Sequence, residues 1–97
     1  MIARISKKMI IVQEAPTHWD IRYALEDVNH ILLTKKYKPV YFFEGTPVIG
    51  QGGFSVIIKL DRELQPAEMR MLKRLLSNRG IKVIIEDELV EQPNTSI

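Results

Sequence analysis

The sequence contains no cysteine, which excludes a disulfide framework and any metal or redox site built on thiolates. It also lacks a long apolar run, because its longest aliphatic stretch is Met9-Ile10-Ile11-Val12. A signal peptide needs an apolar core of about 7 to 15 residues, and a membrane helix needs about 20. We therefore expect a cytoplasmic protein that does not interact with a membrane.

Catalytic and metal-binding groups are equally scarce. On one helix, His18 and His30 would lie about 18 Å apart, too far to share a metal ion. The glycines Gly50, Gly52 and Gly53 precede a predicted strand, so they lack the helix N-terminus that phosphate-binding loops use. No serine lies in a nucleophile elbow. We expect a protein that is not an enzyme and that has no metal and no other cofactor.

What is present is the composition of one small globular domain. The chain has 97 residues, of which 45% are hydrophobic and 27% charged, enough for one core without disulfides. The net charge is +2, but the acids Glu86, Asp87, Glu88 and Glu91 gather near the C-terminus. The rest of the chain is therefore basic. We expect one domain over residues 1–90 and a flexible tail over residues 91–97.

Two amphipathic helices are expected from the apolar pattern. Thr17 and Asp20 suit a capping box that begins the first helix, which should end near Thr34. Pro66 should begin the second helix, and Gly80 should follow it with a positive φ. The core-facing residues should be Ile21, Ala24, Leu25, Val28, Ile31 and Leu32 in the first helix, and Met69, Met71, Leu72, Leu75 and Leu76 in the second.

The strands complete the expected fold. Residues 2–6 either extend the first strand or pair back on it around Lys7-Lys8. The order strand, helix, strand, strand, helix, strand predicts an α+β fold, the ferredoxin-like βαββαβ sandwich, whose four-stranded antiparallel sheet carries both helices on one face. The first and third strands should be central, and the glycine-rich residues 44–53 should form a long hairpin connection. The four strands are expected over residues 8–13, 40–43, 54–60 and 81–85.

The face of the sheet that the helices leave open should be strongly apolar. Strand alternation directs Tyr41, Phe43, Ile57 and Ile84 toward this face, with Val40 and Phe42 pointing inward. Such a patch exceeds what a monomer normally exposes. Three alternatives remain for what covers this face: a second copy of the protein, a different protein, or the chain's own termini and hairpin. We expect a small binding or regulatory protein that acts through protein contacts, with a homodimer as the first choice.

The first helix adds a second candidate surface for a partner. Trp19, Tyr23, Glu26 and His30 recur at helical spacing on the side away from the core. Tryptophan and tyrosine are enriched at interface hot spots, so Trp19, Tyr23 and His30 are expected to contact a partner. In the alternative interpretation, Trp19 folds onto a neighbouring loop.

Two basic groups favour nucleic-acid binding as the alternative function. Arg70, Lys73 and Arg74 fall on one exposed side of the second helix, where they can reach phosphates. Lys35, Lys36 and Lys38 form a second cluster after the first helix. The sheet itself lacks the signature of RNA-binding domains, because the first strand carries no aromatic ring for base stacking.

Overall fold

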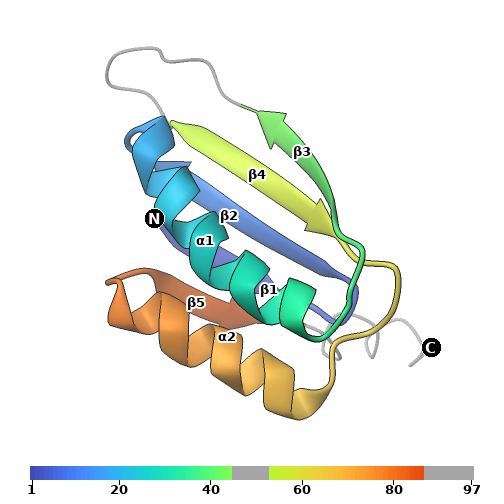
Figure 1. The fold of residues 1–97 in the computed structure, drawn as a ribbon. Helices are drawn as coiled ribbons and strands as arrows, with labels where there is room; N and C mark the ends of the chain where they lie inside the picture. Colours follow the sequence, from blue (N-terminus) through green and yellow to red (C-terminus); the bar gives the residue numbers. More distant parts are fainter. Residues whose placement is uncertain (45–52, 87–97) are drawn as a thin grey trace, which may run out of the picture.

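The computed structural model describes residues 1–44 and 53–86. Both helices lie on the same face of one sheet (Figure 1), whose five strands are ordered β3-β4-β2-β1-β5. The predicted tail and most of the predicted hairpin connection lie outside the described residues. The elements are β1 (Ile2–Ile5), β2 (Met9–Ala15), α1 (His18–Thr34), β3 (Val40–Glu44), β4 (Phe54–Lys59), α2 (Pro66–Asn78) and β5 (Lys82–Ile85).

The prediction of four strands, all antiparallel, is wrong. Residues 2–5 form a separate strand, β1, which pairs back on β2 and lies between β2 and β5. The other side of β1 pairs with β5 in parallel. The turn is closed at Ser6, whose backbone N–H donates to the carbonyl of Met9 at 2.9 Å. The fold is therefore α+β, and the four expected strands keep their predicted order with β1 inserted among them.

Both helices begin where the sequence predicts. The N–H of Asp20 donates to Thr17 Oγ1 at 3.3 Å, and the N–H of Thr17 donates to Asp20 Oδ2 at 3.1 Å, which completes the capping box of α1. The helix ends at Thr34 as expected. Pro66 is the first residue of α2, and Gly80 follows that helix with φ +83°.

One predicted core residue of α2 is exposed. Met71 shows 45% of its surface, whereas Met69 and Leu72 are buried. At 100° per residue, Met71 lies 200° from Met69 around the helix, so the two cannot share a narrow stripe. The expected core residues of α1 are all buried except Leu25, which packs against the core from its rim.

The core lies between the helices and the sheet face that they cover. Strand alternation supplies this face, because every second residue of a strand points to the same side. No helix within residues 1–44 and 53–86 is long and apolar enough to cross a membrane. The fully buried strand residues are Ala3, Ile5, Ile10, Val12, Ala15, Val56 and Ile58.

Candidate functional site

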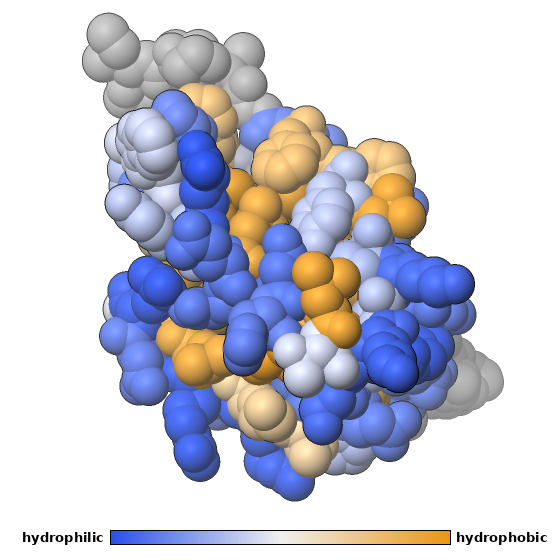
Figure 2. Space-filling view, viewed as in Figure 1, coloured by the Kyte–Doolittle hydropathy of each residue, from blue (hydrophilic) through white to orange (hydrophobic). Residues whose placement is uncertain are grey.

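The edge strand β3 is the most exposed apolar element of the described chain. Val40, Phe42 and Phe43 are 54%, 46% and 64% exposed, respectively. They are three of the seven large hydrophobic residues that stand exposed among the described residues, and all three lie within one strand of five residues. Figure 2 shows apolar side chains gathered over the part of the surface formed by β3 and β4.

The predicted orientation of β3 is inverted. Tyr41 lies opposite Ile58 and Phe43 opposite Val56, and residues directly opposite each other in a sheet share a face. Ile58 and Val56 are fully buried on the helix face, so Tyr41 and Phe43 belong to that face and not to the open one. The Tyr41 hydroxyl confirms this, because it donates a hydrogen bond to Asn29 Oδ1 of α1.

Val40 and Phe42 take the places that were predicted for Tyr41 and Phe43. Phe42 lies opposite Ile57, which in turn lies opposite Ile11 of β2. Ile57 and Ile84 are on the open face as predicted, because Ile84 lies opposite Arg4 of β1. The apolar residues of the open face are Ile2, Met9, Ile11, Val40, Phe42, Ile57 and Ile84.

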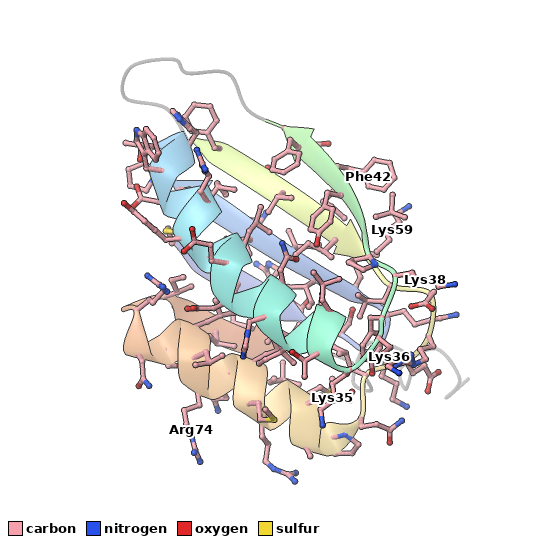
Figure 3. The ribbon with its side chains drawn as sticks, in the orientation of Figure 1. Lys35, Lys36, Lys38, Phe42, Lys59 and Arg74 are labelled. Carbon is pink, nitrogen blue, oxygen red and sulfur yellow. The ribbon has the colours of Figure 1, made fainter. Side chains whose placement is uncertain are left out.

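Polar groups divide this face into two parts. On the β1 and β5 side, Arg4 donates to Gln13 Oε1 at 3.0 Å and to Glu86 Oε2 at 2.5 Å. On the β3 and β4 side, the Lys59 ammonium lies 5.2 Å from the centre of the Phe42 ring, and Figure 3 shows these two side chains projecting near each other from neighbouring strands. The apolar part of the open face therefore meets the edge of the sheet at β3.

The predicted stripe on α1 is exposed. Trp19 is 52% and Tyr23 49% exposed, and Glu26 and His30 are exposed as well. The Trp19 ring lies 4.9 Å from that of His18. Trp19 is thus not buried against the described part of the chain, and the stripe stays a predicted contact surface.

Arginines from α1 and the end of α2 flank this stripe. The Arg22 guanidinium lies 5.1 Å from the Trp19 ring centre, and that of Arg79 lies 5.8 Å from the Tyr23 ring centre. Arg79 also forms an ion pair with Asp27, which joins the end of α2 to α1. These contacts hold the two exposed rings beside positive charge.

The two predicted basic groups are exposed but separate. Figure 3 shows Lys35, Lys36 and Lys38 near the end of α1, with Arg74 projecting from α2 well apart from them. Arg70 and Lys73 are exposed on the same helix as Arg74. The backbone N–H of Lys38 donates to Asp61 Oδ1 at 3.0 Å, which lowers the pKa of that carboxyl.

The pattern in the sequence missed a buried polar pair. The Tyr37 hydroxyl donates to Glu68 Oε1, and the N–H of Gln65 donates to the same oxygen at 2.9 Å. Burial raises the pKa of Tyr37 from 10.0 to about 12, and Glu68 adds to the rise. Burial also acts to raise the pKa of Glu68, but these two hydrogen bonds, together with the positive charges of Lys35 and Arg62, outweigh it and lower that pKa. Glu68 is therefore a structural anchor for the start of α2.

Within residues 1–44 and 53–86, no three acidic or histidine side chains are placed to hold a metal ion. The chain matches no protein-family model, and no curated protein or solved structure is significantly similar to it. Function must therefore be inferred from the chain's own surfaces.

Proposed function

We propose that this protein is a small non-enzymatic binding or regulatory protein that acts through protein contacts and that associates with itself. The observation that carries the proposal is the concentration of Val40, Phe42 and Phe43 on one exposed strand. Val40 and Phe42 lie on the open face and Phe43 on the helix face, so apolar surface is exposed on both sides of this edge. Exposed apolar patches larger than roughly a few hundred Å² mark interaction sites. We also infer that the fold is a ferredoxin-like sandwich enlarged by β1.

The energetics favour burial of this surface. Fully burying a valine or phenylalanine side chain contributes about 1.5 to 3 kcal/mol, and these three are roughly half exposed. Phe42 is placed where the open face meets the sheet edge, next to Lys59. Because its ring faces solvent and not the core, its replacement tests the surface without disturbing the fold.

Sedimentation velocity on matched variants tests the proposal. We expect a dimer at high micromolar concentration, and we expect Phe42→Glu to raise its dissociation constant at least tenfold, as for an interface hot spot. Met71→Glu is the control, because Met71 is equally exposed, at 45% against 46% for Phe42, but lies on α2. A wild-type protein that stays monomeric at high micromolar concentration would falsify self-association.

Nucleic-acid binding is the second candidate. Lys35, Lys36 and Lys38 are all exposed and follow one another closely in the chain. A cluster of this kind attracts phosphates by a salt-dependent, sequence-independent mechanism. It requires no contact by β3, so variants of Lys35 and Lys36 distinguish the two candidates.

A further inference from the structure

The hydrogen bonds of the sheet determine which backbone N–H and C=O groups of β3 point toward β4 and which point away from the sheet. The N–H of Leu60 donates to the carbonyl of Lys8 in the turn before β2 at 2.9 Å. Backbone groups alternate along a strand, so Ile58 and Val56 also point toward β2, and Lys59 and Ile57 point toward β3. The positions opposite Lys59 and Ile57 in β3 are Val40 and Phe42. The backbone groups of Val40 and Phe42 therefore point toward β4.

It follows that Tyr41 and Phe43 direct their N–H and C=O groups away from the sheet. Among the described residues, no strand pairs with this edge. Pro39 has the same phase, and its missing N–H falls on the free edge, the position that a sheet tolerates for proline. In Figure 1 neither helix extends across β3. Within the described part of the chain, the edge is therefore open to another strand.

We propose that a second copy of this chain adds to this edge, β3 against β3 in antiparallel orientation, with Tyr41 on the two-fold axis. This proposal rests on the self-association proposed above and specifies its geometry. Because the axis stands perpendicular to the sheet, the two sheets merge into one and both helical layers stay on the same side. The two Tyr41 residues then exchange both of their backbone hydrogen bonds.

The register is selected by the side chains of β3. With Tyr41 on the axis, Val40 lies opposite Phe42 of the second copy, and Lys38 lies opposite its Glu44. Apolar groups thus meet apolar groups, and opposite charges meet at both ends. Each Phe43 N–H donates to the carbonyl of Pro39 in the other chain, whereas the Phe43 carbonyl gains no bond in return, because Pro39 has no N–H.

Neighbouring registers lose this complementarity. With Phe42 on the axis, Glu44 lies opposite Val40 of the second copy. With Val40 on the axis, Lys38 lies opposite Phe42. In a register that places no residue on the axis, each residue whose backbone groups point out of one strand lies opposite a residue whose groups point back into the other sheet. The two strands then form no backbone hydrogen bonds with each other. The register centred on Tyr41 is the one in which β3 complements itself.

Single cysteines report this register directly, because the chain has no cysteine of its own. Val40 and Phe42 of opposite chains form a pair that is not hydrogen-bonded, with Cα atoms about 4.5 Å apart, within disulfide range. We expect an oxidised mixture of Val40→Cys and Phe42→Cys proteins to yield at least ten times more cross-linked dimer than either protein alone.

The other outcomes separate this proposal from the function it rests on. Cross-linking of Phe42→Cys with itself indicates an axis at Phe42 and overturns the register. A dimer by sedimentation that no mixture cross-links indicates contact through another surface, such as the open face or the exposed stripe of α1, which overturns edge pairing but leaves self-association standing. A monomer under all conditions overturns both.

Charge reversal gives a second measurement that leaves the apolar residues untouched. Lys38→Glu and Glu44→Lys should each raise the dissociation constant about threefold to tenfold, because each places like charges opposite at both ends of the exposed interface. The double variant restores opposite charges across the axis and should return to the wild-type value. Lys73→Glu on α2 is the control. Failure of the double variant to recover overturns the register.

Discussion

Tyr37 and Glu68 connect the stability of the fold to pH. The pKa of Tyr37 is raised from 10.0 to about 12, so folding favours its protonated form. Its contribution is complete below pH 10 and is lost as pH rises toward 12. The pKa of Glu68 is lowered, so its contribution is present above its ordinary pKa and is lost as the pH falls through the lowered value.

Tyr37→Phe should therefore destabilise the protein most near neutral pH. The change removes the hydroxyl that donates to the buried Glu68 carboxylate and leaves it only the N–H of Gln65 on that oxygen, at a cost of about 1 to 3 kcal/mol in the free energy of unfolding. In acid the difference from wild type should shrink as Glu68 becomes protonated. Between pH 10 and 12 the wild type should lose the stability that protonated Tyr37 contributes, whereas the variant has no such contribution to lose.

Urea unfolding across this pH range measures both effects, and ultraviolet titration of the phenols assigns them. The wild-type titration should contain a late phase that is missing from Tyr37→Phe. If the two proteins differ by the same amount at every pH, the coupling between Tyr37 and Glu68 is absent.

Among the elements, the helices could be predicted from the sequence and β3 could not. In α1, Thr17 and Asp20 mark the start by their chemistry, and the apolar period of 3.6 residues fixes the buried side. Val40-Tyr41-Phe42-Phe43 is apolar at every position, so alternation gives no phase. Its orientation is set by tertiary contacts that the local pattern does not contain, such as the bond from Tyr41 to Asn29.

Strand β1 illustrates the same limit. Residues 2–6 were open to two interpretations, because a short apolar segment can lengthen a strand or turn back on it. The choice depends on β5, which is 80 residues away in the register that pairs Ile2 with Lys82. Contacts at this separation in sequence leave no local trace.

A bulge in β2 explains the need for glycine at the start of β4. The pairing shifts between Val12 and Ala15, and Glu14 adopts φ 59°. Gly53 lies against this bulge with φ +124°, and a Cβ atom there would stand 2.3 Å from the Ala15 carbonyl oxygen. Replacement of Gly53 requires the backbone to move.

Gly53→Ala should therefore lower the free energy of unfolding by at least about 2 kcal/mol, from positive φ and the steric clash together. Gly80→Ala is the matched control, because Gly80 also has positive φ but a Cβ there meets nothing within 4 Å. That variant should lose only about 1 kcal/mol. Equal losses in thermal or urea unfolding would show that the clash at Ala15 is relieved without cost.

For the molecule as a whole, the basic residues of α2 and the apolar edge at β3 lie on different parts of the surface. Arg70, Lys73 and Arg74 are exposed on α2. In Figure 1, α2 lies near β5, at the other end of the strand order from β3. The helix pattern could place these side chains outward, but not relative to β3, since that requires the strand order. This separation allows the two candidate functions to be tested independently.

The triple variant Arg70→Ala/Lys73→Ala/Arg74→Ala should dimerise with the wild-type dissociation constant, because none of the three contacts β3 in the proposed dimer. If the protein instead binds nucleic acid through α2, each lost phosphate contact lowers the slope of log affinity against log salt by about 0.7 to 0.9. The triple variant would then lower this slope by about 2 to 3.

The variant Lys35→Ala/Lys36→Ala/Lys38→Ala tests the second basic group, although loss of the Lys38 charge also weakens the proposed dimer. A monomeric wild type that is retained on heparin, with retention lost in either triple variant, would favour nucleic-acid binding. A dimeric wild type that is not retained on heparin would favour protein contact.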